Sequence, residues 1–131
     1  MTKPKYRQNT KTFMYTNPHP KDSKTIGDCV IRAISIATKK DWLTVYDELT
    51  AIGREVLAPP TDIKVIREYM DGIAERVPAM KNRKRLLPTD LPKSGTFVVR
   101  QSHHLTCVRN GKIRDTWNSG NKSAYIIWRV A

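Results

Sequence analysis

Hydrophobic positions in the first half of the chain recur with a helical period. Residues 29–37 are apolar almost all round, the preceding Asp28 is a candidate N-cap, and the pair Lys39 and Lys40 suits a helix C-terminus. A helix with so few polar positions has to lie at the centre of the protein. The pattern therefore predicts a buried central helix.

Two further segments each have one apolar face. Asp41 can cap a helix that ends before Gly53, and Thr61 can cap a helix that has Gly72 near its end. The apolar face of the first contains Trp42, Val45, Tyr46, Leu49 and Ile52, and that of the second contains Ile63, Val65, Ile66, Tyr69, Met70 and Ile73. We expect both helices to cover the central one.

The second half of the chain changes to the period of two that is typical of strands. It predicts four strands, at residues 96–101, 104–109, 112–117 and 124–130. Asn110 and Gly111, between the second and third strands, are the strongest short hairpin signal, because both positions of a type I′ turn have positive φ. Helices followed by an antiparallel sheet predict an α+β fold.

The length of 131 residues fits one domain. We assign residues 25–131 to the α+β domain and residues 1–24 to a basic N-terminal segment, and we expect the basic, proline-containing residues 80–93 to form a surface connection. No apolar run approaches the roughly 20 residues of a membrane span, and no apolar region of a secretory signal follows the basic N-terminus. We therefore expect a cytoplasmic protein that does not contact a membrane.

The net charge of the chain indicates which class of molecule it binds. The chain has 24 Lys and Arg against 12 Asp and Glu, a formal net charge of +12, and nine of the acidic residues lie between residues 26 and 75, so the rest is strongly basic. Such an excess predicts an anionic partner. Residues 81–85 carry four cations but lack the aromatic residues of a stacking platform. We therefore expect an acidic protein or peptide as the partner, with nucleic acid, held by the basic segments, as the alternative.

The hairpin register brings together residues with catalytic chemistry. With Asn110 and Gly111 as the turn, strand alternation places a set of side chains on one face. The set is His104, Thr106, Val108, Ile113, Asp115 and Trp117. His104 and Asp115 are then diagonal neighbours, about 7 Å apart between backbones, so an imidazole and a carboxylate can meet. His103 points to the opposite face.

Cys29 opens the predicted central helix, where free N–H groups and the helix dipole stabilise a thiolate. The carboxylate of Asp28 beside it opposes this effect. A histidine next to Cys29 would offset that charge and take the thiol proton, and a carboxylate would orient the histidine, which gives a Cys-His-Asp triad.

The other cysteine, Cys107, faces away from His104 and is expected in the core. Neither cysteine belongs to a C-x-x-C pair, and a set made of Cys29, Cys107, His103 and His104 has no standard zinc spacing. We expect free thiols, and we predict neither a metal nor another cofactor.

Three motifs resemble the papain-like cysteine peptidase superfamily over about residues 25–130. They are Gly27-Asp28-Cys29-Val30-Ile31-Arg32-Ala33-Ile34, Trp42-x-x-Val45-Tyr46, and His104-x-x-x-Val108-x-x-Gly111-x-x-x-Asp115-Thr116-Trp117-Asn118-Ser119. The chain is most similar to small papain-like proteins of bacteriophage and bacterial genomes. The resemblance implies a hydrolase with Cys29 as nucleophile, His104 as general base and acid, and Asp115 as the orienting residue. It also implies a phage-encoded or phage-related protein, which would act in the host cytoplasm.

One position departs from the papain pattern. Papain has a glutamine six residues before its cysteine that serves as an oxyanion donor, whereas this chain has Ser23. The backbone N–H of Cys29 could act with Ser23, Thr25 or Asn17, and loss of one such donor costs about 2.7–4 kcal/mol. Two functions therefore stay open: a cysteine peptidase, isopeptidase or acyl transferase, and a catalytically inactive papain-like protein that binds an acidic protein or nucleic acid.

Overall fold

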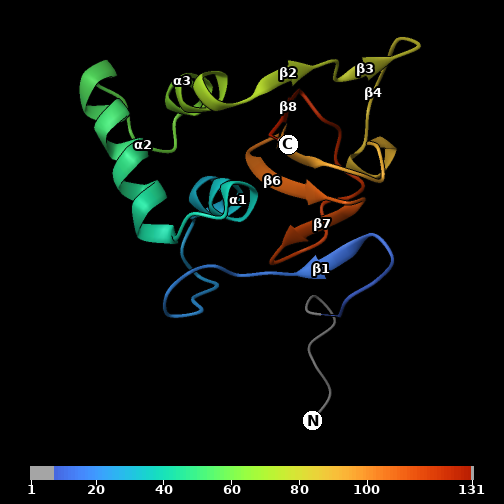
Figure 1. Cartoon of the computed structure of the whole chain (residues 1–131), viewed down its shortest axis with the longest axis horizontal. Coiled ribbons are helices and arrows are strands. Elements are labelled where there is room, and N and C mark those ends of the chain that lie inside the picture. The colour runs from blue at the N-terminus through green and yellow to red at the C-terminus, as the bar shows by residue number, and fades with distance from the viewer. Residues whose placement is uncertain (1–7, 131) are drawn as a thin grey trace.

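The computed structural model, which describes residues 8–130, contains three α-helices and a mostly antiparallel sheet (Figure 1). The helices are α1 Cys29–Thr38, α2 Trp42–Val56 and α3 Ile63–Ile73. The strands are β1 Phe13–Tyr15, β2 Glu75–Val77, β3 Met80–Lys81, β4 Lys84–Arg85, β5 Thr96–Gln101, β6 His104–Arg109, β7 Lys112–Asp115 and β8 Ile126–Arg129. The predicted α+β class is confirmed.

The main sheet has the strand order β1-β7-β6-β5-β8-β2, and β3 and β4 form a separate two-stranded hairpin. β1 is parallel to β7, while the other pairs are antiparallel. The sequence pattern did not predict β1 or β2. β1 comes from the N-terminal segment, and its Phe13 is buried against Ile113 in the second of two apolar clusters.

Helix α1 is the central, buried helix that the apolar run predicted. Every residue from Val30 to Ala37 is buried, and the helix packs against the sheet and α2, in an apolar cluster that also includes residues of α3. Its C-cap is Lys39, in the left-handed region with φ 61°. Asp28 occupies the N-cap position, but its side chain makes no capping hydrogen bond. Asp28 is therefore the N-cap residue, as predicted, but its carboxylate binds other partners instead of the first-turn N–H groups.

The boundaries of α2 and α3 differ from the prediction in two details. Asp41 caps α2 as expected, accepting the Thr44 N–H at 2.7 Å, but the helix continues past Gly53 to Val56. A Cβ on Gly53 would lie 2.6 Å from the Ala58 carbonyl oxygen, so the glycine permits a close backbone approach instead of ending the helix. The cap of α3 is Asp62, not Thr61.

The predicted hairpin is present with its predicted register. Asn110 and Gly111 have φ of 51° and 78°, and the strand pairs run from Arg109↔Lys112 to Cys107↔Arg114. Strands β5 and β6 have the predicted bounds, while β7 and β8 are shorter than predicted. The β6–β7 pairing stops at Cys107, and α1 packs against β6.

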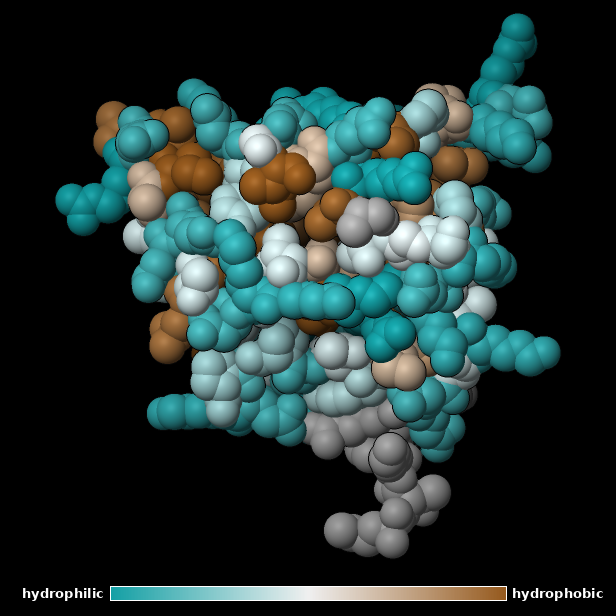
Figure 2. All heavy atoms as spheres, viewed as in Figure 1, coloured by the Kyte–Doolittle hydropathy of each residue, from teal (hydrophilic) through white to brown (hydrophobic). Residues whose placement is uncertain are grey.

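Hydrophilic side chains cover most of the face seen in Figure 2, and hydrophobic ones gather near α2 and α3. Within residues 8–130, no helix combines the length and the apolar character that crossing a membrane requires.

Candidate active site

Cys29 is the first residue of α1 and is partly buried beside the start of β6. Burial raises the pKa of its thiol. This effect is outweighed by hydrogen bonds with His104 and the Leu105 backbone and by the positive charges of His104 and Arg32, all of which lower the pKa. The net effect is a pKa below the ordinary value. The site therefore stabilises the thiolate, the reactive form of cysteine.

His104 links Cys29 to Asp115. Its Nε2 lies 2.8 Å from Asp115 Oδ2, so Nδ1 is the ring nitrogen left for the Cys29 thiol. Burial lowers the pKa of His104, but the hydrogen bonds and charges of Asp115 and Cys29 raise it above the ordinary value. An imidazolium placed between two anions is stabilised in this way.

Asp115, the last residue of β7, is almost completely buried and has four donors besides His104. These are the Thr106 hydroxyl at 2.6 Å, the Thr116 N–H at 2.7 Å, and Arg32 Nε and Nη2 at 3.2 and 3.0 Å. Burial raises the pKa of Asp115, but His104, Arg32 and Thr106 lower it below the ordinary value. The predicted contact between His104 and Asp115 is confirmed, and the carboxylate is held ionised.

Arg32 is a component of the site that the sequence pattern did not identify. Its buried side chain forms ion pairs with Asp115, at 3.0 Å, and with Asp28 one turn earlier on α1. Asp28 also accepts the indole N–H of Trp42 at 2.9 Å. The negative charge beside Cys29 is therefore paired and does not act alone on the thiolate.

The sequence did contain a signal for this network. Arg32 is the only charged residue in the otherwise apolar run 29–37, and it follows Asp28 by four positions, a spacing that places two side chains on one helix face. A lone cation on a helix that must be buried requires a buried anion. The partner 83 residues away could not be read from that pattern.

Trp117 covers the imidazole of His104. The two ring centroids are 4.6 Å apart, and Trp117 is 38% exposed, so it forms a lid over the histidine and is not a core residue. The loop that carries it is held by Gln101, whose amide donates to the Ser119 and Lys122 carbonyls at 2.9 Å each. The lysine side chain in turn donates to the Ser102 carbonyl at 2.7 Å. The lid is therefore fixed to the β5–β6 turn.

The three side chains considered as oxyanion donors lie in the loop before α1. The Asn17 amide donates to Asp22 Oδ1 and to the Ser23 carbonyl, both at 3.1 Å, so both of its N–H bonds are engaged. The hydroxyls of Ser23 and Thr25 are 3.5 Å from each other. Because the Asp28 carboxylate makes no capping hydrogen bond, the first-turn N–H groups, including that of Cys29, do not donate to it.

The structure distinguishes the two cysteines and the two adjacent histidines. Cys107 is completely buried, and burial raises its pKa to about 12, so it stays protonated, as a core residue should. His103 is exposed at the hairpin turn with φ 52°. Among the described residues, no group of three or more His, Cys, Asp or Glu side chains is placed to hold a metal ion.

No known protein family, curated protein or solved structure matches the chain. The function has to be inferred from the site itself. That site has a thiol with a lowered pKa, an imidazole in contact with it, and a carboxylate that fixes the imidazole. These are the components of nucleophilic acyl transfer.

Proposed function

We propose that the protein is a papain-like cysteine hydrolase that cleaves a peptide or isopeptide bond. The observation that carries the proposal is the position of His104, whose ring interacts with the Cys29 thiol on one side and the Asp115 carboxylate on the other. The arrangement of a buried helix that begins with the nucleophile, against a sheet that supplies the other two residues, supports the papain-like interpretation of the α+β fold.

The first half of the reaction forms a thioester. The Cys29 sulfur attacks the acyl carbon while its proton passes to His104 Nδ1, and the carbonyl electron pair moves onto oxygen. The first-turn N–H of α1 stabilises that oxyanion. When the carbonyl re-forms, the C–N bond breaks, and His104 donates its proton to the leaving amine. Asp115 keeps the imidazole in the tautomer that this sequence of transfers requires.

The second half releases the acid. A water molecule loses a proton to His104 and attacks the thioester carbon, and the C–S bond breaks to return the Cys29 thiolate. Another nucleophile in place of water would make the same site an acyl transferase. The net charge of +12 favours an acidic protein or peptide as the substrate, because the field of the protein attracts anions.

Alkylation by iodoacetamide as a function of pH tests the proposed pair. We expect Cys29 to react at pH values below the ordinary thiol pKa of about 8.5, and His104→Ala to shift its profile to higher pH. Mass spectrometry of the labelled peptides separates Cys29 from the inert Cys107, which is an internal reference. His103→Asn is the matched control, since asparagine tolerates the left-handed backbone there. An ordinary Cys29 profile that His104→Ala leaves unchanged would refute the catalytic pair.

A further inference from the structure

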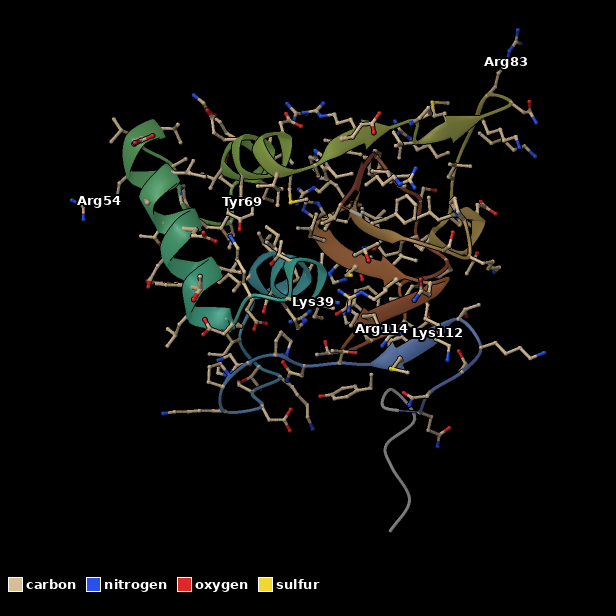
Figure 3. All side chains as sticks on the ribbon, in the orientation of Figure 1. Lys39, Arg54, Tyr69, Arg83, Lys112 and Arg114 are labelled. Carbon is tan, nitrogen blue, oxygen red and sulfur yellow. The ribbon has the colours of Figure 1, made fainter. Side chains whose placement is uncertain are left out.

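A second functional surface is suggested by the hairpin that β3 and β4 form, which we call the basic hairpin (residues 80–85). All six of its residues are exposed, and four of them are cations: Lys81, Arg83, Lys84 and Arg85. Figure 3 shows Arg83 at its tip, projecting from one corner of the molecule, opposite the side where Arg54 of α2 lies. None of these residues takes part in the cysteine site.

The turn of the basic hairpin carries an arginine where glycine is favoured. Lys81 pairs with Lys84, so Asn82 and Arg83 are the two turn residues, with φ of 53° and 65°. Asparagine suits the first position of such a turn, and glycine is strongly favoured at the second because a side chain there is strained. Strained residues of this kind cluster at sites where the side chain has a function. The charge of Arg83 is therefore a candidate for direct contact with a bound ligand.

A groove of about 550 Å³ lies along the basic hairpin. Lys81, Lys84 and Arg85 line it together with Leu86, Leu87 and Asp90. The Asp90 carboxylate already accepts the Leu87 N–H at 2.9 Å, and the two leucines are partly buried. The groove thus combines a cationic rim with apolar side chains, and its volume is within the range of small-ligand sites.

An aromatic ring from another part of the chain completes this surface. The Arg85 guanidinium lies over the Tyr125 ring, 4.2 Å from its centroid, and its Nη1 is 3.4 Å from the Ala124 carbonyl oxygen. Tyr125 is 48% exposed. The two contacts orient the guanidinium and leave its outer face and remaining N–H groups open, and such a face can stack on a base while its edge binds phosphate. The run 81–85 has no aromatic residue in sequence, but the fold supplies one.

We propose that the basic hairpin and Tyr125 form a binding surface for single-stranded nucleic acid. The cations bind successive phosphates, a base stacks on the Arg85–Tyr125 pair, and the leucine side chains contact a neighbouring sugar or base. A duplex would keep its bases inside the stack, away from Arg85 and Tyr125. An acidic peptide could pair with the cations but has no repeated planar ring for the stacking pair, so single strands fit the surface better.

The main test uses Arg83→Gly in the full-length protein. Glycine removes both the charge and the strain, so the midpoint of thermal unfolding should rise while the affinity for a fluorescent oligothymidylate of about 12 nucleotides falls. The slope of log K against log salt between about 50 and 200 mM should become less steep by about 0.7, the contribution of one phosphate contact in a single strand. Damage to the fold cannot mimic this result, because it would lower stability and affinity together.

Two further variants separate stacking from charge. Tyr125→Ala should weaken binding about tenfold without changing the salt slope, because it removes a stacking surface and no charge. Arg54→Ala is the matched control, since it removes an exposed cation from α2 and should leave the affinity unchanged. An equal loss in Arg54→Ala, or no binding at about 50 mM salt, would overturn the proposal.

Competition with an acidic peptide identifies the class of partner. If oligoglutamate of matched charge displaces the oligonucleotide at equal concentration, the partner is an acidic peptide and the nucleic-acid proposal fails. Cys29→Ala should bind the oligonucleotide like the unmodified chain. Failure of this proposal therefore leaves the hydrolase proposal standing, and failure of the hydrolase proposal leaves this one standing.

Discussion

Replacing Arg32 by glutamine tests the central ion-pair network. The substitution leaves two carboxylates, Asp28 and Asp115, that are 1% and 2% exposed and have lost their cation. Removal of one partner from a buried pair costs about 3–5 kcal/mol. Asp28 keeps its hydrogen bond from the indole N–H of Trp42, and Asp115 keeps its contact with His104. We therefore expect the free energy of unfolding to fall by about 3 kcal/mol, the lower end of that range. That is a large part of the roughly 5–15 kcal/mol typical of a domain.

Denaturation by urea at pH 7 measures this loss as a change in the free energy of unfolding, with an unchanged m-value as the sign that two-state behaviour is kept. The double variant Arg32→Gln with Asp28→Asn also lacks the negative charge of Asp28, which Arg32→Gln alone leaves without its cation. We expect the double variant to be more stable than Arg32→Gln alone by roughly 1 kcal/mol, because contacting residues are energetically coupled. Arg54→Gln, at an exposed position, should change stability by no more than about 0.5 kcal/mol.

The same variant should also alter the reactivity of Cys29. The Arg32 charge lowers the pKa of Cys29, so its removal should move the alkylation profile to higher pH. A loss below about 1 kcal/mol together with an unchanged alkylation profile would refute the reasoning. It would mean that Arg32 is solvated and that neither carboxylate depends on it.

Two further predictions concern His104 and a pair of glycines. The folded-state pKa of His104 is raised and that of Asp115 is lowered, so their pair stabilises the fold most between about pH 4 and 6.5, near the two unfolded values. The stability difference between the protein and His104→Gln should shrink as pH rises through the folded pKa of His104, and a pH-independent difference would contradict this. Gly53→Ala should destabilise by about 1–3 kcal/mol because its Cβ would meet the Ala58 oxygen, whereas Gly72→Ala, with open space around it, should stabilise by about 0.5–1 kcal/mol, both measured by urea denaturation.

Local signals predicted the parts of the site that are close in sequence. The Asn110–Gly111 turn determines the register of its two strands, and that register alone placed His104 near Asp115. The helix that begins at Cys29 was equally evident, because a run of nine residues that are apolar except for Arg32 and Ser35 leaves few alternatives. The predicted contact between Cys29 and His104, however, depended on the chemistry of the two side chains and on the family resemblance. No local sequence pattern links the start of a helix to a distant strand.

The parts that could not be predicted depend on distant partners. β1 is a parallel edge strand whose partner β7 is about 100 residues away, and three residues give too short a pattern to detect. Gly53 resembled a helix end because glycine often occupies that place, yet the reason for it is the Ala58 carbonyl. Thr61 and Asp62 are both good caps, so sequence cannot separate adjacent candidates.

The position of α1 along the sheet determines the distance between Cys29 and His104, and two arginines fix that position. Near the start of α1, Arg32 binds Asp115 of β7; at its end, Arg109 of β6 donates to the carbonyls of Ile36 and Ala37. A helix rises about 1.5 Å per residue, so sliding α1 by even one residue would break both sets of contacts and separate the thiol from the imidazole. Arg32 therefore does two things at once: it pairs with the carboxylates near Cys29, and it holds α1 at the register in which His104 contacts Cys29.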